Sequence, residues 1–124
     1  MSNPIGWFEI YVDNIERAKT FYQTVLGVNL EKLGDPTGGD LEMWCFPSDM
    51  ETYGATGALV KVDGFSPGGN STLVYFSCND CAVEEARVVN AGGKIQQPKM
   101  SIGEFGFCTL AVDTEGNMFG LHSN

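Results

Sequence analysis

Three ionisable side chains stand out in this chain of 124 residues because each could bind a ligand or move a proton. His122 is the only histidine. Glu9 interrupts the apolar stretch WFEIYV, where a buried carboxylate is costly unless it is paired. Lys61 follows the apolar run GALV and could supply the opposite charge. The set predicts hydrogen bonding, ion pairing or acid–base catalysis.

Each of the three has more than one interpretation. His122 is a half-exposed residue bonded to a backbone carbonyl, a hydrogen-bonding or acid–base group, or a metal ligand. Glu9 forms a structural ion pair with Lys61 or His122, or it binds substrate and acts as a general base. Lys61 faces solvent instead if the register of its strand differs by one residue.

The stretch CNDC places Cys78 and Cys81 at a C-x-x-C spacing where a helix begins. A helix N-terminus lowers the pKa of a thiol. Cys78 nevertheless shares a strand face with Val74 and Phe76, so it points toward a buried helix, and a zinc site would need a second pair of cysteines. We therefore expect reduced, structural thiols in a cytoplasmic protein.

Composition limits the class of protein. The net charge of −9 disfavours nucleic acid, which is bound through lysine and arginine, although an acidic surface attracts cationic ligands. The hydrophobic content of 43% is that of a globular protein. No stretch approaches the ~20 apolar residues of a membrane span, and the start MSNPIGW lacks a secretory pattern. We expect a soluble protein without nucleic-acid or membrane partners.

The first half of the sequence predicts one helix among four strands. Residues 7–12 alternate, with Phe8, Ile10 and Val12 on one face. Helical spacing follows from a cap at Asp13 or Asn14 to a glycine stop at residue 27. Three further strands are expected within 28–34, 40–47 and 57–62, separated by the turns DPTGG and PSDMETYGATG.

The second half repeats this order. A strand at 71–78 precedes a helix that is capped by Asp80 and ends at Gly92, and strands follow at 94–100, 105–113 and 117–123. The fold class predicted is α+β, with two tandem βαβββ modules of roughly sixty residues. The boundaries are about 5–63 for module 1, 64–71 for a connector and about 72–124 for module 2. Because each module is too small to bury its apolar face alone, we expect a single domain over 1–124.

Two motifs link this pattern to a known family. The run D-N-x-x-R-A-x-x-F-Y spans residues 13–22, and D-x-x-G-N spans residues 113–117. With the tandem modules, they resemble the vicinal oxygen chelate superfamily of glyoxalases, bleomycin resistance proteins and extradiol dioxygenases. The resemblance implies a cup-shaped mixed sheet around a small-molecule site. It also implies homodimers, and a divalent metal with four strand ligands in the catalytic members.

The four metal positions implied by the resemblance do not carry metal ligands here. They fall at Trp7, at Lys61 with Val60 as the alternative, at Leu73 and at Gly120. Divalent ions need carboxylate, imidazole or thiolate donors, and an ammonium repels them. We therefore expect no metal and no other cofactor.

Strand alternation predicts which side chains line the cup. If the buried side chains face the helices, their neighbours face the cup, and Lys61 does so if Val60 and Val62 face the helices. The predicted ligand-binding residues are Trp7, Glu9, Tyr11, Lys61, Leu73, Tyr75, Met118, Gly120 and His122. Glu9 and His122 are the catalytic candidates.

The main hypothesis is a protein that binds or sequesters a small organic molecule, cationic or aromatic, without a divalent metal. The alternative is a glyoxalase-like lyase or isomerase, or a dioxygenase, that uses Glu9 with His122 or Lys61. In that alternative a divalent metal could be held by Glu9 and His122. A third hypothesis is a structural dimer module. The sequence leaves open whether the protein is an enzyme.

Overall fold

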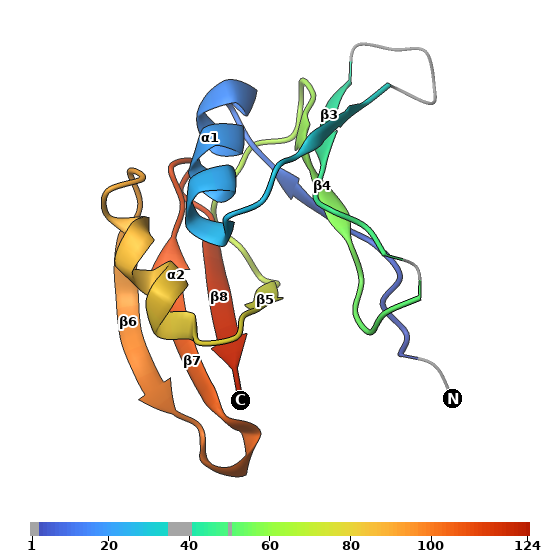
Figure 1. Ribbon diagram of the computed structural model, residues 1–124. Helices are drawn as coiled ribbons and strands as arrows, with labels where there is room; N and C mark the ends of the chain where they lie inside the picture. The colour runs from blue at the N-terminus through green and yellow to red at the C-terminus, as the bar shows by residue number, and fades with distance from the viewer. Residues whose placement is uncertain (1–2, 35–40, 50) are drawn as a thin grey trace.

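The computed structural model describes residues 3–34, 41–49 and 51–124 (Figure 1). The first five elements are β1 (Phe8–Tyr11), α1 (Ile15–Leu26), β2 (Glu31–Leu33), β3 (Glu42–Cys45) and β4 (Gly57–Lys61). The remaining elements are β5 (Tyr75–Ser77), α2 (Cys81–Val88), β6 (Lys94–Ser101), a 3₁₀ turn (Gly103–Phe105), β7 (Phe107–Val112) and β8 (Met118–Ser123). The predicted repeat of a βαβββ order is confirmed.

The strands form two four-stranded mixed sheets. The order is β1-β4-β3-β2 in the N-terminal sheet and β5-β8-β7-β6 in the C-terminal sheet. In each sheet the first strand pairs in parallel with the last strand of its module, and the other pairs are antiparallel. The α+β fold class is therefore confirmed, with β1 and β5 as unpaired edges of two sheets that Figure 1 shows side by side. The predicted turn DPTGG lies outside the described residues.

The boundaries of α1 agree with the sequence pattern. Asn14 is the N-cap, and its side chain accepts a hydrogen bond from the backbone N–H of Arg17 at 3.0 Å. Gly27 ends the helix in a left-handed conformation with φ of 68°, and its N–H donates to the carbonyl of Gln23. Both ends of the helix are thus fixed by local sequence.

The second helix is shorter than predicted. Asp80 caps it as expected, accepting a hydrogen bond from the N–H of Ala82 at 3.0 Å. The helix ends at Val88, four residues before Gly92, because the chain turns tightly there. The N–H of Gly93 donates to the carbonyl of Val88, and Gly92 has a φ of 104° that favours glycine. The glycine therefore closes the turn after the helix.

An aromatic cluster joins the two sheets to α1. The ring centroids of Phe46 and Phe76, one from each module, lie 5.4 Å apart. Tyr22 of α1 contacts both rings and also Phe119 of β8, at 5.5 Å. Such aromatic pairs add stability beyond the area that they bury. The core thus belongs to both modules.

A buried carboxylate ties the start of α1 to the turn between β7 and β8. Glu115 accepts hydrogen bonds from the backbone N–H groups of Asp13 and Asn14 at 3.0 and 2.9 Å. It also pairs with Arg17, whose Nε lies 2.6 Å from Oε2. The carboxylate is fully buried, whereas the guanidinium is half exposed. The motif at residues 13–22 is therefore hydrogen-bonded to the motif at residues 113–117.

Two more residues of the second motif strengthen this junction. The hydroxyl of Tyr22 donates to Asp113 at 2.5 Å, and the amide of Asn117 donates to the carbonyl of Tyr11 at 2.9 Å. Burial raises the pKa of Asp113, although the hydrogen bonds that it accepts oppose this effect. The conformation of the β7–β8 turn is thus coupled to both β1 and α1.

The ionisation of Glu115 should make stability depend on pH. Burial disfavours its charge, but the donors from Arg17, Asn14, Thr114 and Asp13 outweigh burial and lower the pKa from 4.5 to about 2. A pKa that is lower in the folded than in the unfolded protein stabilises the folded state at pH values above the unfolded-state pKa. This stability is lost as the pH falls toward the folded-state pKa. The affected window therefore runs from about pH 4.5 down to pH 2.

We predict that Glu115→Gln lowers the free energy of unfolding at pH 7 by about 3 kcal/mol, because an amide cannot accept from all these donors. The variant should also lose less stability than the parent between pH 4.5 and 2. Urea unfolding at several pH values measures both effects. Glu16→Gln is the control, since this exposed carboxylate pairs only with Lys19. Equal losses in the two variants would contradict the assignment.

Candidate functional site

The face of β1 that points away from the core carries a carboxylate between two aromatic side chains. Trp7 Nε1 donates to Glu9 Oε2 at 3.2 Å, and the hydroxyl of Tyr11 donates to Glu9 Oε1 at 2.7 Å. The bond to Glu9, burial and the negative charge together raise the pKa of Tyr11. Glu9 itself is exposed, so it does not need the ion pair that a buried carboxylate would require. We call this surface, with its counterpart on the second sheet, the cup face.

The register of the N-terminal sheet corrects the placement of Lys61. Glu9 pairs with Ala58 and Tyr11 pairs with Val60 in the parallel ladder, so these residues share the cup face. Lys61 follows Val60 and therefore points to the opposite face. The prediction that Lys61 lines the cup was wrong, because Val60 and not Lys61 continues the cup face. Among the described residues, the ion pairs do not include Glu9 with Lys61 or His122.

The C-terminal sheet contributes a second part of the cup face. Tyr75 pairs with Gly120 and Ser77 pairs with His122, as the alternation predicted. The ring of Tyr75 lies directly over Gly120, so that a Cβ at position 120 would overlap the ring. Tyr75 therefore fills the space that a larger side chain at position 120 would need.

His122 adopts the structural arrangement among its alternatives. Its Nε2 lies 2.7 Å from the carbonyl oxygen of Phe105 in the 3₁₀ turn, which requires the Nε2–H form. The bond fastens the loop before β7 to the end of β8. Glu9, by contrast, bonds with Trp7 and Tyr11 on the other sheet.

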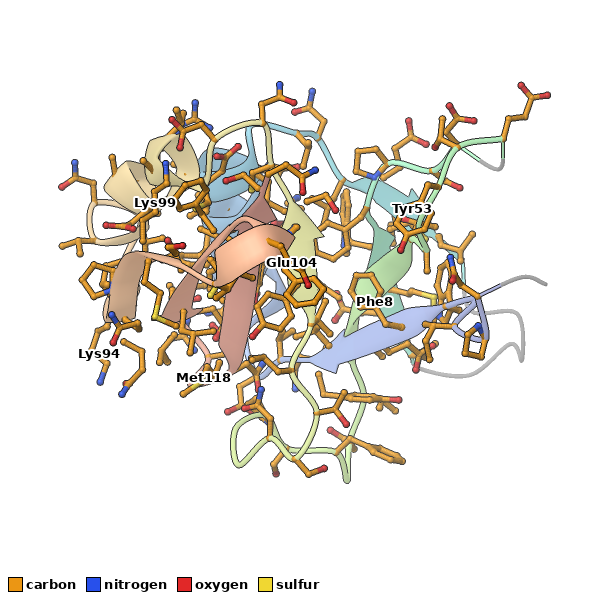
Figure 2. All side chains as sticks on the ribbon, turned by 90° about the horizontal axis from the view of Figure 1, so that it is seen from below. Phe8, Tyr53, Lys94, Lys99, Glu104 and Met118 are labelled. Carbon is orange, nitrogen blue, oxygen red and sulfur yellow. The ribbon has the colours of Figure 1, made fainter. Side chains whose placement is uncertain are left out.

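Three of the predicted binding residues line one cavity. It has a volume of about 810 Å³ and is lined by Trp7, just before β1, and by Leu73 and Tyr75 of the second module. Ile5 and Tyr53 extend its wall on the side of the N-terminal sheet. In Figure 2, Phe8 and Tyr53 lie on that side, whereas Met118 lies on the side of the C-terminal sheet.

Three others line a neighbouring cavity of about 380 Å³. Glu9 and Tyr11 meet Met118 there, and Asn70 and Asn117 supply amide groups. The two cavities together place six of the nine predicted residues along the line where β1 faces the second module. Both are large enough for a small organic molecule.

Several lining residues were not predicted from the sequence. Tyr53 lines the larger cavity and is 88% exposed in the loop before β4. Phe65 stacks on Tyr11, a lining residue of the smaller cavity, with ring centroids 5.0 Å apart. Asn70 exchanges two hydrogen bonds with the backbone of Met118. Strand alternation could not place these residues because they lie in loops. Their aromatic or amide character within Gly- and Pro-rich segments was the only signal.

The cysteines of the C-x-x-C stretch are free thiols in partly or fully buried positions. All four cysteines are free, and Cys81 is buried at the start of α2. Burial, together with nearby Glu84, raises the pKa of Cys78 to about 12. The predicted effect of the helix N-terminus is therefore overcome, and the Cys78 thiol is a poor nucleophile at neutral pH.

The side chains at the four family metal positions do not fit a divalent ion. Trp7, Val60 and Leu73 offer no donor of the required kind, and the fourth position is a glycine covered by Tyr75. Among the described residues, no three histidine, cysteine, aspartate or glutamate side chains are grouped so that they could hold a metal. We derive no chemistry through a metal for this cup.

Comparison with known proteins supports the superfamily. Residues 5–36 match the family described as "Bleomycin resistance protein-like N-terminal". The resemblance to the vicinal oxygen chelate superfamily is thus confirmed by this match and by the fold. Among curated protein sequences there is no significant match. In the described part of the chain, no helix has the length and apolarity needed to cross a membrane.

Solved structures show the same fold. A glyoxalase I variant from Zea mays superposes with a TM-score of 0.75 at 22% identity, covering 97% of this chain and 46% of that protein. The chain thus spans about half the length of that enzyme. A glyoxalase/bleomycin resistance protein from Albidiferax ferrireducens gives 0.73 at 17% identity, covering 98% and 100% of the two chains. TnmS3, an antibiotic binding protein from a Streptomyces strain, gives 0.66 at 25% identity, covering 98% and 95%.

We predict that Gly120→Ala lowers the free energy of unfolding by about 1 kcal/mol, because the new methyl group displaces the ring of Tyr75. In a Tyr75→Ala background the same substitution should cost almost nothing. A double-mutant cycle by urea unfolding measures this coupling. Gly6→Ala is the control, since no atom lies within 4 Å of its added carbon. Additive effects of Gly120→Ala and Tyr75→Ala would contradict the packing.

Proposed function

We propose that the protein binds a small organic molecule in the cavity between β1 and the start of the second module. The observation that carries this proposal is the 810 Å³ space bounded by Trp7, Tyr53 and Tyr75. Ligand sites are typically concave, mostly apolar and aromatic, with few polar groups. The named function of TnmS3, antibiotic binding, supports a binding role for a chain of this size and fold.

The ligand class that we propose is an aromatic or organic cation. Glu9 lines the adjoining cavity of about 380 Å³, where it accepts hydrogen bonds from Trp7 and Tyr11, and Phe65 stacks on Tyr11. A carboxylate beside aromatic faces attracts an ammonium group through charge and cation–π interaction. The net charge of −9 adds a favourable long-range field.

We further propose that the site works without a divalent metal. The non-ligating side chains at Trp7, Val60 and Leu73 support this, as does the ring over Gly120. A carboxylate and aromatic rings then recognise the ligand where a metal would otherwise chelate it. Sequestration therefore fits this site better than a reaction that needs a Lewis acid.

The arrangement around Glu9 and His122 does not favour the enzymatic alternative. Both oxygens of Glu9 accept hydrogen bonds from neighbours on the same strand, and His122 is bonded to a backbone carbonyl. A general base needs a free path to the proton that it removes. The catalytic roles of Glu9 and His122 stay predictions from the sequence, and turnover that Glu9→Gln abolishes would support them.

We predict that benzyltrimethylammonium binds the protein and changes its tryptophan fluorescence, whereas phenylacetate binds at least about tenfold more weakly. Glu9→Gln should weaken binding of the cation at least about tenfold, because it removes the negative charge. Trp7→Phe should remove the fluorescence change, since the other tryptophan, Trp44, packs against Lys19. Fluorescence titration and calorimetry measure both effects.

Glu42→Gln is the matched control for this titration. Glu42 is opposite Lys61 in the β3–β4 ladder and, like Lys61, points to the face of the sheet away from the cup. The control should bind like the parent. Equal affinity of cation and anion for the parent, or no effect of Glu9→Gln, would contradict the ligand class. Elemental analysis of protein purified without chelator should find less than stoichiometric metal, and one bound divalent ion per chain would contradict the metal-free site.

We also propose a homodimer. Large apolar side chains are exposed on and beside the cup face, including Trp7, Tyr75 and Phe105. Exposed apolar patches of this kind mark interaction surfaces. A second copy covering them would also close the open side of the cup.

We predict that sedimentation at micromolar concentration gives the mass of two chains. Phe105→Asp should shift the equilibrium toward one chain, because Phe105 is 67% exposed in the 3₁₀ turn. Val83→Asp is the control, since this exposed apolar residue lies on α2, away from the cup face. A parent protein that sediments as one chain, or equal effects of the two variants, would contradict the dimer.

A further inference from the structure

A separate cavity of about 250 Å³ lies on the helix side of the two sheets. It is lined by residues from the end of α1, the first half of α2, β5 and the segments that flank β3 and β4. Its main lining residues are Phe8, Leu26, Val28, Phe46, Phe76 and Glu84. Phe8 also lines the cup cavities, but Trp7, Glu9 and Tyr75 do not line this one.

Glu84 is the only ionisable residue in this apolar lining. Its Oε1 is buried and has no hydrogen-bond partner, and it is the only such side-chain atom among the described residues. A buried acceptor without a donor is destabilising, and more so when it carries charge. Native proteins contain few such groups, and each needs an explanation.

Two donors on neighbouring residues also have backbone partners. Arg87, one turn further along α2, donates from Nη1 to the carbonyl of Val25 at 3.1 Å. This position suits its charge, because the C-terminal end of α1 is the negative end of the helix dipole. The thiol of Cys78 donates to the carbonyl of Phe76 at 3.6 Å. The described ion pairs do not include Glu84.

The Cys78 thiol also shows that the carboxylate lies in a poorly solvated environment. Burial raises the pKa of this thiol to about 12, and the charge of Glu84 and a hydrogen bond between the thiol and the Glu84 side chain add to the effect. A thiol is neutral when protonated and negative when ionised, so it cannot supply the positive charge that would balance Glu84. The cavity therefore combines an apolar wall, three aromatic rings and one negative group in need of a donor.

We propose that this cavity is a second ligand site, specific for a primary or secondary organic ammonium with a small apolar body. The N–H of the ligand donates to Glu84 Oε1, and the apolar body contacts Leu26, Val28 and the phenylalanine rings. The ammonium also gains from the faces of these rings. The small volume excludes the larger ligands that the 810 Å³ cavity can hold.

The proposed site differs from the cup in what it requires of a ligand. Both oxygens of Glu9 already accept hydrogen bonds, so the cup offers charge and aromatic faces and accepts a quaternary ammonium. Glu84 instead needs a donor, which a quaternary ammonium lacks. Methylation of the ligand nitrogen should therefore separate the two sites.

The test uses 2-phenylethylammonium and its N-trimethyl analogue as probes, with binding followed by calorimetry and by amide chemical shifts in NMR. The primary ammonium should shift the amides of Val28, Ser77 and Glu84, and should bind there at least about tenfold more tightly than the trimethyl compound. Equal affinities at these amides, or shifts confined to Trp7, Glu9 and Tyr75, would overturn the proposal.

Glu84→Gln should reduce the affinity for 2-phenylethylammonium at least about tenfold while the melting temperature stays equal or rises, because the charge is removed from a side chain whose Oε1 is buried without a partner. Glu16→Gln, an exposed charge on the first turn of α1, should change neither. Glu9→Gln should leave binding at the Val28 and Ser77 amides intact, which separates this site from the cup. A lower melting temperature for Glu84→Gln would overturn the proposal, because it would show that Oε1 is satisfied within the protein.

Discussion

The buried carboxylate of Glu115 is the constraint on which the geometry of the cup depends. It accepts five hydrogen bonds from donors at the start of α1 and in its own turn. Removing such an acceptor leaves buried donors unpaired, which is more costly than losing an exposed ion pair. Because β1 leads into α1 and β8 leaves this turn, the carboxylate sets how β1 lies against the second module. The hydrogen bond from the Asn117 amide to the backbone carbonyl of Tyr11 also holds β1 against the β7–β8 turn.

Strand alternation then divides β1 between two environments. Phe8 and Ile10 join the core, while Trp7, Glu9 and Tyr11 face the cup. The same alternation in β5 and β8 places Phe76 and Leu121 in the core, with Tyr75 and Gly120 outside. Each sheet therefore presents aromatic residues on both faces, one set for packing and one open to a ligand. At the position where the resemblance implies a fourth metal ligand, glycine makes room for the ring of Tyr75.

Local rules recovered the elements, the caps and the superfamily motifs from the sequence. They failed for Lys61, because the run GALVK is apolar at four successive positions and alternation alone cannot choose its face; only pairing with β1 does. The bond between His122 and Phe105 could be given as an alternative but not selected, since it depends on a distant loop. Tyr53 and Phe65 lie in loops, where no periodicity applies. The unpaired state of Glu84 depends on tertiary packing, which its place in an amphipathic helix does not reveal.

The contrast between Glu9 and Glu84 shows how one residue type can support two kinds of recognition. Glu9 is exposed, and each of its oxygens accepts one hydrogen bond, from Trp7 or Tyr11, so its charge is available to solvent. Glu84 keeps an unused lone pair in an apolar pocket, where an added hydrogen bond is stronger than in water. The arrangement around Glu9 destabilises the folded state little, and it favours recognition of a ligand by its charge and shape. The arrangement around Glu84 lowers stability until a donor arrives, which is the pattern expected where function rather than folding retains a polar group.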